Sequence, residues 1–190
     1  MQEGSDEQLM AAVKAGDQVA LATLVSRHHA SLLGYLYRLV GGDRPLAEDL
    51  LQETLLHMLR QRTYLADRPF KPWLYMIATN LARDHFKSAA VRRCWRSGDS
   101  SEEALLQLYD SAAGPEERAL AAEQGGEVRV ALSQLREEYR VVLLLRFYQG
   151  FSLQEIAETL QIPLGTVKSR LSVGLHRLRS MLTPLQKGVD

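Results

Sequence analysis

Residues 150–179 read "GFSLQEIAETLQIPLGTVKSRLSVGLHRLR", and this stretch decides the fold of the C-terminal part of the chain. Ser152 and Glu155 match the Ser-x-x-Glu pattern of a capping box, which predicts that a helix begins there. Pro163 cannot continue that helix, and Thr166 is a candidate N-cap for a second one. Two short helices joined by a tight break are typical of a helix-turn-helix.

The second of these helices is predicted to have one apolar and one cationic side. Its apolar stripe is expected at Val167, Leu171, Gly174, Leu175, Leu178 and Leu182. Residues 165–189 contain five Lys or Arg and no acidic residue. In a helix-turn-helix the second helix enters the major groove, where such cations contact phosphates and guanine edges. The alternative is a solvated pair of helices in an ordinary helical domain.

The composition fits a globular protein. The chain has 190 residues, of which 46% are hydrophobic, enough for a sizeable core. Its longest apolar run falls short of the ~18 residues of a membrane span, and the polar, acidic N-terminus is unlike a signal peptide. The single cysteine, Cys94, cannot form an internal disulfide, so we expect a cytoplasmic protein. Cys94 stands among arginines that would favour its thiolate, so both a redox role and a bystander thiol remain open.

Charge is distributed unevenly along a chain whose net charge is zero. Residues 97–127 carry one basic and eight acidic side chains, whereas residues 128–190 carry nine basic and five acidic ones. The acidic stretch is also rich in Ser and Gly, which is typical of a linker. We therefore predict a helical domain at 1–92, a flexible linker at 93–115 and a second helical domain at 116–187.

The N-terminal part has helical periodicity throughout. Helices are expected within residues 6–16, 17–42, 43–65 and 73–93, and Trp73 is assigned to the core. Nowhere does the sequence show the alternation of a half-buried strand. The predicted fold class is all-α.

Three motifs in fixed order resemble bacterial sigma factors. They are "AEDLLQETLLHML" at 47–59, "FKPWLYMIATNLARDHFK" at 70–87 and "GFSLQEIAETLQIPLGTVKSRL" at 150–171. The compact two-domain form resembles the extracytoplasmic-function (ECF, group IV) sigma factors. The resemblance implies a protein that is not an enzyme and needs no cofactor or metal. It would bind core RNA polymerase and direct initiation at promoters with −10 and −35 elements.

The resemblance also assigns residues to each of these roles. Asp49, Gln52 and Glu53 would dock on the clamp helices of the polymerase β′ subunit, and they share one helix face by spacing. The alternative is an acidic helix start that only favours helicity. The −10 element would be contacted by Tyr64, Phe70, Asn80, Arg83, Lys87 and Arg92. The −35 element would be contacted by Thr166, Lys168, Ser169, Arg170, Ser172 and Arg177. For Tyr64 and Phe70, base stacking and a place in the core are equally open.

Two positions depart from the family pattern. Val173 stands where Arg is common, which weakens the expected −35 contact. Arg136 stands where Pro is usual, and we expect it to lengthen a helix. The resemblance further implies contact with the polymerase β subunit and inhibition by an anti-sigma factor, often membrane-anchored.

Two other classes of protein compete with this interpretation. A helix-turn-helix repressor or activator acting without core polymerase would explain residues 116–187 but leave the first two motifs without a role. A metal hydrolase could use His28, His29, His57 or His85. The sequence has no HExxH, no CxxC and no Gly-rich phosphate loop, and two adjacent histidines point in different directions on a helix.

Overall fold

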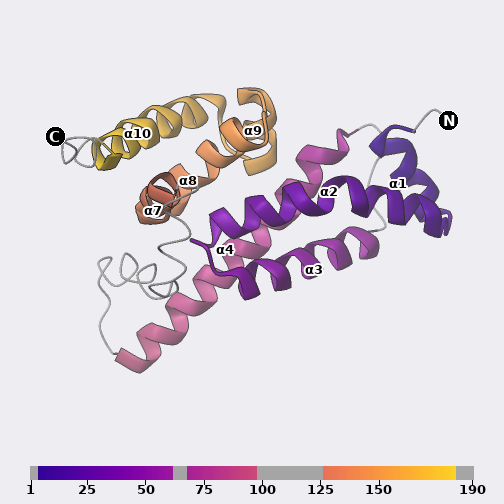
Figure 1. Cartoon of the computed structure of the whole chain (residues 1–190), viewed down its shortest axis with the longest axis horizontal. Coiled ribbons are helices and arrows are strands. Elements are labelled where there is room, and N and C mark those ends of the chain that lie inside the picture. The colour runs from indigo at the N-terminus through magenta and orange to yellow at the C-terminus, as the bar shows by residue number, and fades with distance from the viewer. Residues whose placement is uncertain (1–3, 62–67, 98–125, 183–190) are drawn as a thin grey trace.

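The computed structural model describes residues 4–61, 68–97 and 126–182, and over these residues it consists of helices joined by short turns (Figure 1). The N-terminal helices are α1 (Asp6–Lys14), α2 (Gln18–Leu39), α3 (Arg44–Arg60) and α4 (Phe70–Ser97). The C-terminal helices are α7 (Gly126–Gln134), α8 (Glu137–Leu143), the π-helical η2 (Leu144–Tyr148), α9 (Leu153–Leu160) and α10 (Leu164–Leu182). The all-α prediction is confirmed for the described residues. Most of the expected linker, residues 98–115, lies outside them.

The N-terminal helices pack around α2, which contacts α1, α3 and α4. Leu32, Leu36 and Leu39 recur at helical spacing on the inner side of α2 and are fully buried. Asp17 and Asp43 cap α2 and α3, because their side chains accept backbone N–H groups of the first turn. These local signals are present in the sequence, which is why the helix starts were predictable.

The helix-turn-helix is formed by α9 and α10. Both halves of the capping box are present, since Ser152 Oγ accepts the Glu155 N–H at 3.1 Å and Glu155 accepts the Ser152 N–H at 2.7 Å. Gln161 ends α9 in the left-handed region, with φ of 53°. The predicted N-cap at Thr166 is wrong: α10 already begins at Leu164, because the Pro163 carbonyl accepts the Thr166 N–H.

The expected continuous helix through Arg136 is also wrong. The chain breaks between α7 and α8, and Arg136 has extended backbone angles of φ −55° and ψ 141°. The Arg140 guanidinium donates hydrogen bonds to the backbone carbonyls of Ser133 and Leu135, at 2.9 and 2.7 Å. Because these carbonyls at the end of α7 have a side-chain donor, the helix can stop there without a buried unpaired acceptor.

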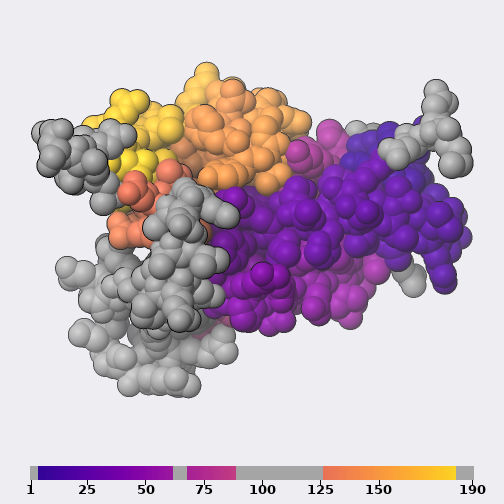
Figure 2. Space-filling model, in the orientation of Figure 1, coloured from indigo at the N-terminus to yellow at the C-terminus, as the bar shows by residue number. Residues whose placement is uncertain are grey.

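The C-terminal helices pack against the N-terminal ones, and we call this packing the closed arrangement. Helix α9 lies on α4, and α7, α8 and η2 lie on α2. Figure 2 shows the orange C-terminal helices directly against the purple surface of the N-terminal helices. Helix α3 lies on the other side of α2 (Figure 1). The closed arrangement was not predicted, because the sequence indicated only two helical parts and a linker.

Candidate nucleic-acid interface

Helix α10 presents one open polar face. Five exposed polar residues of α10 lie on one side of the helix by helical spacing: Lys168, Ser169, Ser172, His176 and Arg179. The opposite side packs on α8, α7 and α9, and Val167 on that side is fully buried. Gly174 makes this packing close, since an added Cβ would lie 3.2 Å from Leu143 Cδ1. Leu175, predicted to belong to the apolar stripe, is 39% exposed instead.

The candidate −35 residues divide between this open face and its flank. Lys168, Ser169 and Ser172 lie on the open face. Arg170 lies on the flank towards α8, where its Nη2 is 3.3 Å from Glu138 Oε2.

Arg177 and Thr166 occupy the same flank of α10 by helical spacing. The guanidinium carbon of Arg177 lies 4.9 Å from the centre of the Tyr139 ring, a cation–π distance. Arg179 was not among the candidates, although the three- and four-residue spacing of exposed polar residues places it on the open face.

The candidate −10 residues are only partly at the surface. Phe70 is fully buried, with its ring 5.3 Å from that of His28 and 5.8 Å from that of Trp73, so of the two alternatives left open for Phe70 the structure favours a place in the core. The cause is helix α1, which packs over the start of α4.

Further along α4 the candidates reach solvent. Asn80 and Lys87 are exposed. Arg83 is half-buried, and its Nε donates to Glu137 Oε1 at 2.8 Å. Tyr64 lies outside the described residues, as does the side chain of Arg92.

The three candidate polymerase contacts share an exposed face of α3. Asp49, Gln52 and Glu53 are all exposed. Leu56 lies at the centre of the same face by helical spacing and is 48% exposed, and Leu59 at its edge is 45% exposed. Leu56 and Leu59 were not among the candidates, because leucines at helical spacing are typical of core positions.

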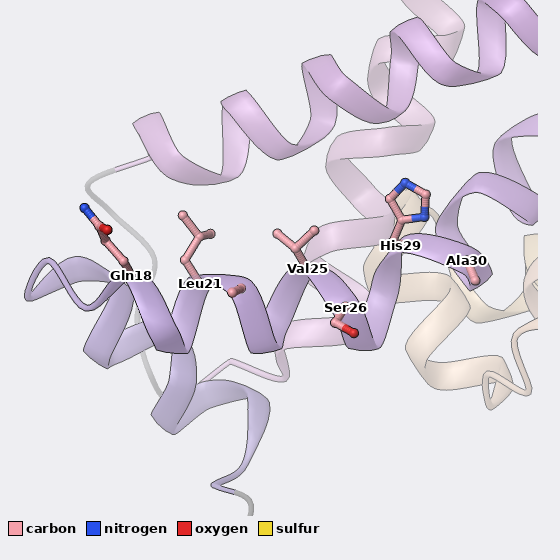
Figure 3. A pocket seen from close by; sticks show the side chains of 7 residues that line it. Gln18, Leu21, Val25, Ser26, His29 and Ala30 are labelled. Carbon is pink, nitrogen blue, oxygen red and sulfur yellow. The ribbon is translucent and has the colours of Figure 1, made fainter.

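An open groove runs along α2 (Figure 3). It is open to solvent and lined by Gln18, Leu21, Val25, Ser26, His29 and Ala30, among others. His29 reaches this groove, whereas His28 is buried and lies 2.7 Å from Asp6 Oδ2. The two adjacent histidines therefore do not converge on one site. Within the described ranges, no group of three His, Cys, Asp or Glu side chains could hold a metal ion.

The chain matches two family models of the sigma-70 class. Residues 24–92 match "Sigma-70 region 2" and residues 125–178 match "Sigma-70, region 4". The first match contains α3 and most of α4, and the second contains the helix-turn-helix. The fold and these matches define a promoter-recognition protein of the sigma class.

Curated relatives narrow the class to one group. The chain is 34% identical to the RNA polymerase sigma-H factor of Pseudomonas aeruginosa over 95% of both chains. It is 32% identical to the ECF sigma factor SigW of Bacillus subtilis, covering 91% of this chain and 94% of that one. With SigL of Mycobacterium tuberculosis the identity is 35%, covering 90% and 93%. The chain belongs to the ECF group of bacterial RNA polymerase sigma factors, which direct promoter-specific transcription together with core RNA polymerase.

Solved structures share the fold. CnrH, in complex with the cytosolic domain of CnrY, is similar with a TM-score of 0.70 and 24% identity over 94% of this chain and 97% of that one. The sigma factor RpoE of Bartonella quintana, in complex with the anti-sigma factor NepR, is similar with a TM-score of 0.62 and 24% identity over 86% and 96%. In the part of the chain that the structure describes, no helix is long and apolar enough to cross a membrane.

Proposed function

We propose that each of the three candidate surfaces binds a different partner of a sigma factor. The α3 face docks on core polymerase, the exposed part of α4 holds the −10 element, and α10 reads the −35 element in duplex DNA. The observation that carries this proposal is the placement of an acidic face and a cationic face on different helices. An acidic face repels phosphate, so α3 is suited to a basic protein surface and not to DNA.

The α3 face would dock through a mixed polar and apolar contact. Asp49 and Glu53 supply the charge that steers the encounter with a basic partner, and Gln52 supplies a neutral hydrogen-bonding group. Leu56 lies between them and would lose its exposed surface on docking. The buried core of an interface is more apolar than its rim, where charged groups are more frequent. We therefore add Leu56 and Leu59 to the proposed polymerase contacts.

The α10 face would enter the major groove. Lys168, Ser169 and Ser172 lie near its N-terminal end, which is the end that meets base edges in a helix-turn-helix. Arg179 lies on the same face further along and would contact phosphates. Arg170 is committed to Glu138, so we propose that it positions α10 on α8 and that its contribution to DNA binding is smaller.

Helix α4 would contact the −10 strand through Asn80, Arg83 and Lys87. Single-stranded DNA is held by cations along its backbone and by stacking of its bases on aromatic rings. Because Phe70 is buried, its ring is not available for base stacking in this structure. Tyr64 and Arg92 stay in the proposal on the sequence motif alone.

A further partner follows from the family. One solved relative is in complex with the cytosolic domain of CnrY and the other with the anti-sigma factor NepR. We propose that an anti-sigma factor tethered to a membrane controls this chain as well. A subunit of the polymerase acts where the polymerase acts, so we place the chain in the cytoplasm. We assign no catalytic step to it, because the polymerase performs the chemistry.

Transcription in vitro tests the assignment. Purified chain is added to core RNA polymerase with fragmented bacterial genomic DNA, and the 5′ ends of the RNA products are mapped. The proposal predicts discrete start sites, preceded by shared sequences about two helical turns apart, that appear only when chain and core are both present. A chain that binds specific DNA without core and gives no new start sites would instead support the repressor interpretation.

A further inference from the structure

The closed arrangement involves the helix that is proposed to hold the −10 strand. Near the start of α4, Lys71 Nζ donates to the Gln149 carbonyl at 2.8 Å, and the Tyr75 hydroxyl donates to Gln149 Oε1 at 2.6 Å. Burial raises the pKa of Tyr75 to about 12, so this hydroxyl keeps its proton at neutral pH. Gln149 therefore connects the end of η2 to α4 through two direct hydrogen bonds.

One contact of the closed arrangement occupies a proposed DNA-binding group directly. Arg83 Nε and Glu137 Oε1 are 2.8 Å apart, and the two side chains are only 24% and 26% exposed. Because water screens a partly buried pair less than an exposed one, this contact is stronger than an ordinary surface ion pair. A carboxylate here meets the same guanidinium that a DNA phosphate would meet.

The closed arrangement is also too compact to span a promoter. Arg83 contacts Glu137 and Arg170 contacts the next residue, Glu138. Fully extended side chains and the ~3.8 Å between consecutive Cα atoms allow at most about 20 Å between the two guanidiniums. Elements about two helical turns apart lie roughly 70 Å from each other, at ~34 Å per turn. The C-terminal helices must therefore leave α4 before both elements can be bound.

The two DNA-binding faces differ in the closed arrangement. Arg83 on α4 is held by Glu137 across the contact between the N-terminal and C-terminal helices. Lys168, Ser169 and Ser172 on α10 remain exposed. Closure therefore affects single-strand binding by α4 and leaves duplex binding by α10 largely as it is.

We propose that the closed chain is autoinhibited at α4 alone, with Glu137 occupying Arg83 in place of a DNA phosphate and Gln149 contributing to the contact that keeps the C-terminal helices on α4. The inference rests on the proposed function, since it takes α4 as the single-strand site. A partner opens the chain only if it binds the open form better than the closed one. Core polymerase, which must accommodate both elements of a promoter, is such a partner.

The test compares an opening variant with a matched control, in full-length chain without core polymerase. The opening variant is Glu137→Gln with Gln149→Ala, which removes the ion pair and the Tyr75 bond without touching a proposed DNA contact. The control is Glu158→Gln with Gln154→Ala, an exposed pair on α9 whose side chains bond to each other at 3.0 Å. In both variants one carboxylate becomes a neutral amide and one glutamine is truncated to alanine. The probes are a labelled 20-nucleotide single strand of mixed sequence and the corresponding duplex, each titrated from 50 to 200 mM salt.

The opening variant is expected to bind the single strand at least about threefold more tightly than the control, with a salt slope steeper by about 0.7, the value of one recovered contact. Its affinity for the duplex should equal that of the control. Adding Arg83→Gln to the opening variant should remove the gain. Equal single-strand affinity of opening and control variants overturns the inference, as does a gain that survives Arg83→Gln. Neither result affects the proposed function, which fails only if wild-type chain and core give no promoter-dependent start sites.

Discussion

Arg140 on α8 donates to the carbonyl of Leu39, the last residue of α2, at 2.7 Å. The same guanidinium donates to Ser133 and Leu135 at the end of α7, and Arg140 is fully buried. A buried cation is costly unless its donors are used, and helix ends have carbonyls that need donors. One arginine thus satisfies the ends of two helices that lie on opposite sides of the closed contact.

Replacing Arg140 by Met should destabilise the chain by at least about 2 kcal/mol, because three carbonyls that it serves lose a buried donor. Urea unfolding followed by circular dichroism measures the loss. Arg136→Met is the control, since Arg136 is an exposed cation four residues away and its loss should cost under ~0.5 kcal/mol. Equal stability of the two variants would mean that Arg140 does not hold these helix ends.

The capping box of α9 predicts a pH dependence of stability. The hydrogen bond from the Ser152 backbone N–H lowers the pKa of Glu155 below its ordinary value of 4.5. The charged form is therefore favoured by folding, and its contribution is present above pH 4.5 and lost as the pH falls through the lowered pKa. The unfolding free energy of wild type should exceed that of Glu155→Gln at pH 7, and the difference should shrink towards pH 3. A difference that grows on acidification would contradict the sign of this linkage.

Local signals in the sequence predicted much of this fold. Ser152, Glu155 and Pro163 define the helix-turn-helix through capping and backbone chemistry that depends on few neighbours. The features that the sequence did not predict depend on tertiary contacts. Phe70 is buried between α1, the His28 ring of α2 and Trp73. Arg140 donates to the last carbonyls of α7 from a position that its bond to the Leu39 carbonyl of α2 helps to fix. The exposure of Leu56 likewise follows from which side of α3 remains without a neighbour, and periodicity alone does not reveal that.

The open face of α10 predicts the salt dependence of duplex binding. Lys168→Gln and Arg179→Gln should each lower the slope of log K against log salt by about 0.9, the value of one phosphate contact. Both residues are exposed, so thermal unfolding should change little. Arg136→Gln, an exposed cation outside α10, is the control. Slopes that match the control in both variants would place the duplex elsewhere on the molecule.

Arg170 should behave differently from these residues. Because Arg170 pairs with Glu138 and is only 24% exposed, Arg170→Gln leaves this carboxylate with one cation fewer where α8 meets α10. We expect a loss of about 1 kcal/mol in unfolding free energy, larger than for Lys168→Gln. Its effect on the salt slope should be smaller than that of Lys168→Gln. The reverse order in both measurements would assign Arg170 to the DNA instead of to Glu138.

Affinity for core RNA polymerase tests the central claim most directly. Asp49→Lys with Glu53→Lys reverses the charge of the α3 face, and the control, Glu127→Lys with Glu158→Lys, makes the same charge change at exposed positions on α7 and α9. Binding of labelled chain to core polymerase is titrated for wild type and both variants. We expect the control to bind nearly as tightly as wild type, whereas the α3 variant should lose at least about tenfold in affinity because opposed charges become like charges. If the α3 variant binds core polymerase as tightly as the control, the α3 face is not the polymerase contact.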